Sequence, residues 1–167
     1  MKDIIVIRNF QSNDLDACRD LWRELVDWHR VLYDDYTIGG EYPRDHFEKH
    51  LSRVGKERIW VAFSDSKMVG LMGLIVKEDE AEIEPLIISQ EYRQKGIGTK
   101  LIDTAIAVTR SLGLTSLSVR PVLRNLDALL FFYRRGFKTL GQIELFMSLS
   151  KKEFKNNIDL FNISFNY

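Results

Sequence analysis

The chain has 167 residues, the size of one folded domain, and 45% of them are hydrophobic, as in ordinary globular proteins. Lysine and arginine together number 24, as do aspartate and glutamate, so the net charge is zero. This balance argues against a protein built mainly to coat nucleic acid or an anionic membrane.

Cysteine content and hydropathy indicate the compartment. The one cysteine, Cys18, excludes a disulfide within the chain and fits a reducing environment; its helical spacing predicts a small core residue rather than a catalytic thiol. The first eight residues lack the apolar run of a signal peptide, and no stretch approaches the ~18 apolar residues of a membrane span. We therefore expect a cytoplasmic protein with no membrane or nucleic-acid partner.

The N-terminal part of the chain predicts one strand followed by two helices. Polar residues at 12–14 can cap a helix, and the apolar residues after them recur at spacings of three and four, which is typical of an amphipathic helix. In chain order we expect a strand at 4–7, a helix at 15–26, a loop at 34–43 and a shorter helix at 45–54.

Two histidines, His46 and His50, lie four residues apart on the second predicted helix, a spacing that can hold a metal ion. No third ligand is evident in the sequence. We interpret both as surface histidines and predict no metal site.

The rest of the chain alternates strands and helices. A turn signal at 64–67 separates two apolar runs and predicts a hairpin. The expected elements are strands at 59–63, 68–76 and 82–88, a helix at 96–112, a strand at 115–119, a helix at 125–135 and two strands within 137–149. The order βααβββαβαββ predicts an α/β (α+β) domain with a mixed central sheet and flanking helices.

A strand, a glycine-containing turn and a helix follow one another between Leu86 and Ile102. The first turn of a helix has unpaired N–H groups and a partial positive charge, and Gly96 and Gly98 would let phosphate oxygens approach them. Basic side chains surround this turn, at Arg93, Lys95 and Lys100. The pattern favours a pyrophosphate site over a plain turn with solvated basic residues.

The run Arg93-Gln94-Lys95-Gly96-Ile97-Gly98 resembles the Arg/Gln-x-x-Gly-x-Gly/Ala signature of the GNAT N-acetyltransferase superfamily. The resemblance covers residues 3–149 and implies the GNAT-type acyl-CoA N-acyltransferase fold, with acetyl-CoA as co-substrate. It implies that backbone N–H groups of residues 94–99 hold the pyrophosphate, and that the strand ending at Ile88 pairs with the pantetheine arm, where strands 82–88 and 115–119 splay apart. The expected cofactor-binding residues are Leu86, Ile87, Ile88, Arg93, Gln94, Lys95, Gly96, Ile97, Gly98, Thr99, Asn125 and Phe132.

Two carboxylates on the third strand of the central series, Glu82 and Glu84, are candidate general bases. An attacking amine must be neutral, and a carboxylate can take its proton directly or through water. Strand alternation predicts that both lie on one face together with Leu86. In the superfamily, a glutamate fourteen residues before the first motif glycine often acts as the base, and Glu82 holds that position. The alternative is a solvated strand face or an ion pair, for instance with Arg120.

A second motif begins at Asn125 and ends at Gly136-Phe137, which is similar to the family pattern Asn-x-x-Ala followed by Gly-Phe. The resemblance implies that Asn125 contacts the pantetheine arm, and Asn125 can also cap a helix. Family members usually carry a tyrosine seven residues after this asparagine, which protonates the leaving thiolate. Here Phe132 holds that position and Tyr133 follows it, so either Tyr133 or water is the expected acid.

These observations predict an N-acetyltransferase that moves the acetyl group of acetyl-CoA directly to a primary amine of a small molecule or peptide. The alternative, favoured only by Phe132, is a non-catalytic acyl-CoA-binding regulatory module. We expect the catalytic domain at 1–149 and a C-terminal extension at 150–167. Residues 161–167 alternate apolar and polar side chains, so we expect a strand that joins an exposed sheet edge, its own or that of a second subunit in a homodimer; local packing of its aromatic residues is the alternative.

Overall fold

The computed structural model describes residues 4–147, 149, 154 and 156–167. The chain forms two compact units, Met1–Arg120 and Pro121–Tyr167. The expected division into 1–149 and 150–167 stays a prediction.

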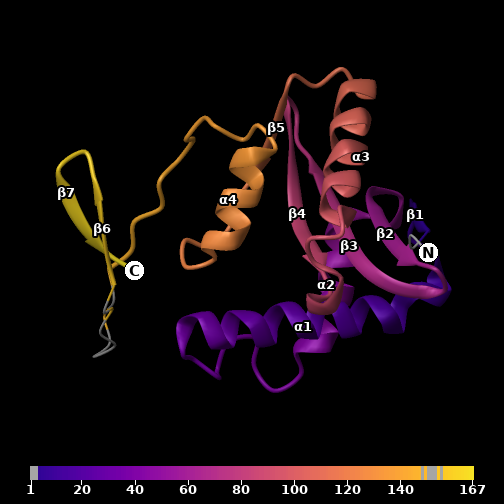
Figure 1. Cartoon of the computed structure of the whole chain (residues 1–167), viewed down its shortest axis with the longest axis horizontal. Coiled ribbons are helices and arrows are strands. Elements are labelled where there is room, and N and C mark those ends of the chain that lie inside the picture. The colour runs from indigo at the N-terminus through magenta and orange to yellow at the C-terminus, as the bar shows by residue number, and fades with distance from the viewer. Residues whose placement is uncertain (1–3, 148, 150–153, 155) are drawn as a thin grey trace. The chain divides into compact units, whose positions relative to one another are not determined.

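The first unit is built on a five-stranded mixed sheet with the strand order β1-β2-β3-β4-β5 (Figure 1). Neighbouring strands are antiparallel except β4 and β5, which run parallel. The strands are β1 (Ile5–Asn9), β2 (Ile59–Ser64), β3 (Lys67–Val76), β4 (Glu80–Ile88) and β5 (Ser116–Val119). The mixed α/β class predicted from the sequence is confirmed.

Helices cover both faces of this sheet. They are α1 (Leu15–Tyr33), α2 (His46–Val54) and α3 (Ile97–Ser111). Helices α1 and α2 share one core cluster with the sheet, formed by residues that include Cys18, Leu21, Phe47, Leu71 and Ile87. Helix α3 contacts the sheet strands through buried residues outside that cluster, which places it on the opposite face.

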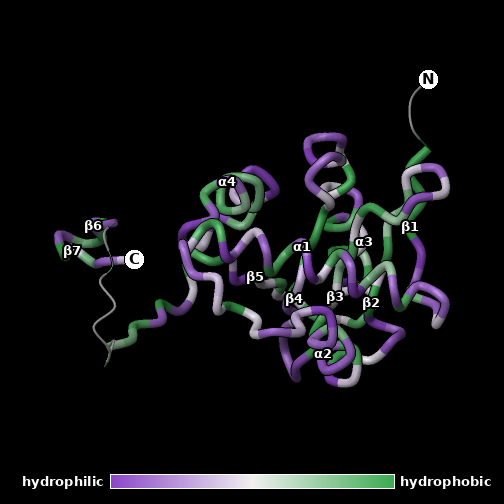
Figure 2. Tube along the Cα trace, turned by 90° about the horizontal axis from the view of Figure 1, so that it is seen from below, coloured by the Kyte–Doolittle hydropathy of each residue, from purple (hydrophilic) through white to green (hydrophobic). Residues whose placement is uncertain are grey.

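One apolar stripe on each helix explains this packing. Figure 2 shows both hydrophobic and hydrophilic residues along α1 and α2, as expected of helices that bury one side. Cys18 is fully buried, and burial raises the pKa of its thiol to about 12. Cys18 is therefore a core residue, as predicted. None of the helices in the described ranges combines the length and the apolar character needed to cross a membrane.

The second unit contains a helix and a hairpin. Helix α4 (Leu126–Arg134) begins at Asn125, whose side chain accepts a hydrogen bond from the Ala128 N–H at 3.2 Å. Strands β6 (Asn157–Leu160) and β7 (Ile163–Asn166) pair antiparallel around a tight turn. The turn residues Phe161 and Asn162 have φ of 54° and 64°, the left-handed conformations of a two-residue hairpin turn.

The element order βααβββαβαββ is the predicted one, but the last two strands lie elsewhere. Residues 137–147 and 149 form no strand, so the prediction of two strands within 137–149 is wrong for these residues; residue 148 lies outside the described chain. The predicted strand at 161–167 is shorter, because Phe161 and Asn162 form the turn. Within this unit its partner is β6, and its pairing with another sheet edge or a second subunit stays a prediction.

Candidate functional site

A glycine-initiated helix follows the buried strand β4. After Ile88 the chain forms a short 3-10 turn, Gln90–Tyr92, and Gly96 then caps α3 with a φ of 81°. The first α-helical hydrogen bond runs from the Lys100 N–H to the Gly96 carbonyl at 3.2 Å. The N–H groups of residues 96–99 therefore have no acceptor within the helix, which makes this turn suited to an anion. The predicted strand, turn and helix are confirmed; their role in binding stays a prediction.

Aromatic rings hold two of the basic side chains beside this turn. The Arg93 guanidinium lies 5.1 Å from the centre of the Trp28 ring, and its Nε donates to the Ile88 carbonyl at 3.2 Å. The Lys95 ammonium lies 4.5 Å from the centre of the Tyr92 ring. Both cations are thus fixed near the start of α3, where they would add to the positive end of the helix dipole.

Strand β4 extends well beyond its pairing with β5. The parallel register runs from Glu80–Ser116 to Ile83–Val119 and ends there, while β4 continues to Ile88. Within the described residues, no strand is paired to the β5 side of β4 after Ile83. Backbone groups on that side are therefore open to an extended ligand that carries amide groups, such as the pantetheine arm.

A β-bulge interrupts β4 opposite Gly73, where two residues of β4, Glu84 and Pro85, face one residue of β3. A Cβ atom at Gly73 would clash with the Glu84 carbonyl oxygen and would lie 2.8 Å from His50 Nε2. Only glycine allows this close approach of strand and helix. The bulge therefore brings the backbone at Glu84 against β3 and next to α2.

The bulge decides which β4 side chains share a face. Glu82 pairs with Ile75 on the face that α1 and α2 cover, and Glu84 reaches Arg53 of α2, so the prediction that both carboxylates share a face is confirmed. Leu86, predicted on that same face, pairs with Met72 and lies on the opposite one. That part of the prediction is wrong, because the extra residue in the bulge reverses the alternation of the strand.

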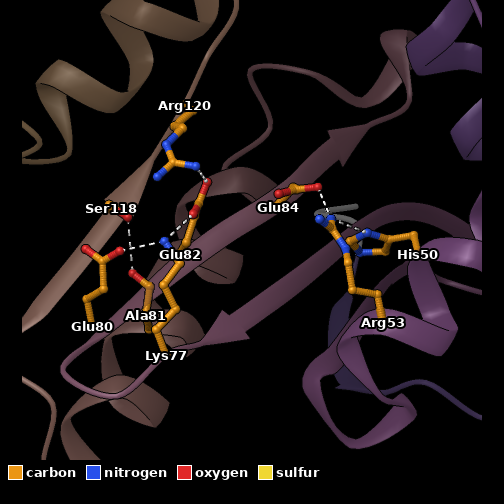
Figure 3. A network of polar contacts seen from close by, with 9 residues as sticks. All are labelled: His50, Arg53, Lys77, Glu80, Ala81, Glu82, Glu84, Ser118 and Arg120. Carbon is orange, nitrogen blue, oxygen red and sulfur yellow. Dashed lines mark hydrogen bonds and ion pairs between the residues drawn. The ribbon is translucent and has the colours of Figure 1, made fainter. Parts of the chain in front are cut away.

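Glu82 is buried between two cations. Its side chain is 3% exposed; the Lys77 Nζ lies 3.0 Å from its Oε2, and Arg120 Nη1 lies 3.2 Å from its Oε1 (Figure 3). Lys77 also pairs with Glu80 at 2.6 Å. The ion pair with Arg120, which is the alternative to a role as base, is present. Each oxygen of this carboxylate thus already contacts a cation.

Glu84 is more accessible and lines a cavity. Its side chain is 41% exposed and forms an ion pair with Arg53. Figure 3 shows Arg53 between this carboxylate and the His50 ring, with Arg53 Nη2 3.4 Å from His50 Nδ1. The cavity has a volume of about 300 Å³ and is lined by Trp22, His46, Lys49, His50, Arg53 and Glu84.

His50 is buried, so its interpretation as a surface histidine is wrong. It is 4% exposed, and its ring centre lies 5.0 Å from that of Trp22. Burial lowers the pKa of His50 to about 4, which leaves the imidazole neutral near pH 7. The spacing from Phe47 to His50 to Val54 is the buried stripe of α2 and could have revealed this. Among the described residues, no three His, Cys, Asp or Glu side chains group closely enough to hold a metal ion.

The second unit contains the remaining candidates, Asn125, Phe132 and Tyr133. Phe132 is 6% exposed, with ring centres 5.4 Å from Phe131 and 5.6 Å from Phe137. Tyr133 is 54% exposed. It lies on a different side of α4 from Phe132, because consecutive residues of a helix are about 100° apart. Within this unit, Asn125 caps the helix as predicted, and the cofactor contacts of all three stay predictions.

Comparison with known proteins gives consistent similarities. The sequence model of the Acetyltransferase (GNAT) family matches residues 20–137. The spermidine N(1)-acetyltransferase of Thermoplasma acidophilum is 25% identical over 80% of this chain and 88% of its own. The human N-acetyltransferase 8 is 28% identical over 72% of this chain, which spans about half (52%) of that protein.

Among solved structures, the PaiA N-acetyltransferase of Thermoplasma acidophilum in complex with coenzyme A superposes with a TM-score of 0.71. Its sequence is 24% identical, and the match covers 84% of this chain and 93% of that one. This likeness shows a shared fold.

Proposed function

The chain belongs to the GNAT family of acetyltransferases, and from this premise we propose that it transfers the acetyl group of acetyl-CoA to a primary amine. The observation that carries the proposal is the combination of an open β4 edge after Ile83 with a glycine-capped helix at the end of the same strand. One strand thus offers backbone groups to an extended amide-bearing arm and then leads into a phosphate-binding turn.

In this proposal, residues 86–88 pair with the pantetheine arm, and the N–H groups of residues 94–99 bind the pyrophosphate. Arg93 and Lys95 add positive charge beside the turn. Asn125 and Phe132 are assigned to the pantetheine contact from the family motif alone. The bound acetyl-CoA supplies an activated thioester, and the chain supplies positioning of the two reactants.

Glu84 is the general base that we favour. An alkylamine has a pKa near 10.4, so only about one molecule in a thousand is neutral at pH 7, and a base must remove the proton. Glu84 lines the cavity and is partly exposed, whereas both oxygens of Glu82 are already engaged by Lys77 and Arg120. Tyr133 or water protonates the departing thiolate.

A matched pair of variants tests this assignment. Glu84→Gln should lower kcat by about 10²-fold or more while leaving coenzyme A affinity unchanged. Glu82→Gln keeps the shape of the side chain but removes its charge between two cations. Its main effect should therefore be a lower free energy of unfolding, with a smaller effect on kcat than that of Glu84→Gln. If Glu82→Gln abolishes turnover in a folded protein and Glu84→Gln does not, Glu82 is the base.

One observation favours a second function, a non-catalytic acyl-CoA-binding module: Phe132 stands where the family usually carries its tyrosine acid. Thiol release from acetyl-CoA in the presence of a panel of amines separates the two functions. An enzyme forms free coenzyme A thiol from acetyl-CoA only when an acceptor amine is present. A binding module forms no free thiol with or without an amine.

A further inference from the structure

Resting on the proposed function, we infer that the acceptor is a small primary amine that also carries a carboxylate group. The cavity beside Glu84 lies on the α1–α2 face of β4, at the point where pairing with β5 has ended. An acceptor in this cavity would meet the acyl end of a ligand lying along the open edge of β4.

The lining of the cavity carries more positive than negative charge. Lys49 and Arg53 stand four residues apart on α2 and therefore on one side of the helix. Glu84 is the one carboxylate among the lining residues, and it already pairs with Arg53. Lys49 has no carboxylate partner among the residues that the structure describes. The buried, neutral His50 does not offset this charge.

A zwitterionic acceptor would complete this set of charges. Its ammonium group would replace Arg53 at the Glu84 carboxylate, and its own carboxylate would then lie within reach of the released Arg53 and of Lys49. An arginine can hold a carboxylate through two parallel hydrogen bonds, which also fixes its orientation. The amine would thus be bound next to the group that removes its proton.

Size and charge together disfavour a polyamine. A volume of about 300 Å³ is at the lower end for small-molecule sites and fits a molecule of amino-acid size, with Trp22 as an apolar wall. A polyamine would bring several positive charges against Lys49 and Arg53 with only Glu84 to balance them. The loop at 34–43 carries three acidic residues, Asp34, Asp35 and Glu41, and none of them lines the cavity.

The test uses the full chain with acetyl-CoA and free α- and ω-amino acids, each compared with its own primary amide, and with spermidine. Product formation is followed by mass spectrometry and initial rates. We expect kcat/KM to be at least about tenfold higher for the best acid than for its amide, because the amide lacks the charge-assisted hydrogen bonds.

A variant pair tests the role of the cavity in this preference. Lys49→Gln should raise KM more for the acid than for the amide, so the acid-to-amide ratio of kcat/KM should fall. Arg110→Gln removes an equal charge from the exposed end of α3 and should keep the ratio.

Each other outcome overturns the inference. If amides or spermidine are acetylated best, or if Lys49→Gln leaves the acid-to-amide ratio intact, the acceptor class is wrong while the acetyltransferase function stands. If coenzyme A binds but no amine of this panel is acetylated, the inference fails, and thiol release from acetyl-CoA with the wider amine panel decides whether the proposed function stands.

Discussion

Acid should destabilise the fold through His50 before it affects the carboxylates. The pKa of His50 is lowered by burial from 6.5 to about 4. Between these two values the unfolded chain binds a proton that the folded chain does not, so the free energy of unfolding falls as the pH falls. A shift of this size corresponds to a loss of about 2 kcal/mol between pH 7 and pH 5.

Other groups affect the same measurement and can be separated from His50. Burial also lowers the pKa of His29, which adds a loss of the same sign. The Arg8 guanidinium holds the pKa of the Asp14 carboxyl below its usual value near 3.8, so stability from that pair is lost only at lower pH. The pH window from 7 to 5 therefore reports mainly on His50 and His29.

The assay is urea unfolding followed by tryptophan fluorescence, at pH 7 and pH 5, for the wild type and two variants. His50→Gln removes the titrating ring. The fall in its free energy of unfolding from pH 7 to pH 5 should therefore be about 2 kcal/mol smaller than the fall in the wild type. Any packing defect cancels, because it is present at both pH values. His29→Gln, measured in the same way, gives the separate contribution of the second histidine whose pKa burial lowers. The reasoning is refuted if His50→Gln loses as much stability as the wild type.

Two further predictions concern ligand binding and catalysis. Gly98→Glu should place a carboxylate at the phosphate turn and reduce acetyl-CoA affinity at least tenfold, about 1.4 kcal/mol, in calorimetry; a folded variant with unchanged affinity would remove the turn from the site. Tyr133→Phe should slow single-turnover acetyl transfer if Tyr133 protonates the thiolate, and an unchanged rate would assign that step to water. If Phe132 occupies the position of the family's usual tyrosine, Phe132→Tyr should be tolerated or should increase the rate of acetyl transfer.

The framework of the first unit followed from periodicity. Apolar stripes at spacings of three and four gave α1 and α3, and Gly96 gave the start of α3 within one residue. The hairpin of β2 and β3 and the parallel pair of β4 and β5 were also expected, and both are present. These features depend on the spacing of apolar residues along the chain, because each element buries one face. That spacing can be read from a single sequence.

The details of the candidate site depend on contacts between distant segments. The bulge at Glu84 arises where β4 meets Gly73 and α2. The alternation of polar and apolar residues does not reveal it, and the local signal is Pro85, because a proline within a strand favours an edge or a bulge. The cavity residues Lys49 and Arg53 were not identified, because solvated helix cations look the same in sequence. In the tail, the β6–β7 turn has no glycine, the usual signal of such a hairpin, so its position was missed.

The bulge in β4 gives the two halves of one strand separate tasks. In an unbroken strand that turns Glu82 and Glu84 toward α2, Leu86 would follow them and Ile87 would leave the core that it shares with Leu71. Because of the extra residue, the carboxylates before the bulge and the apolar Ile87 after it all face the same side of the sheet. The inserted residue thus corrects the phase of the strand. If one residue were deleted there, either Glu82 and Glu84 would turn away from α2 or Ile87 would turn out of the core.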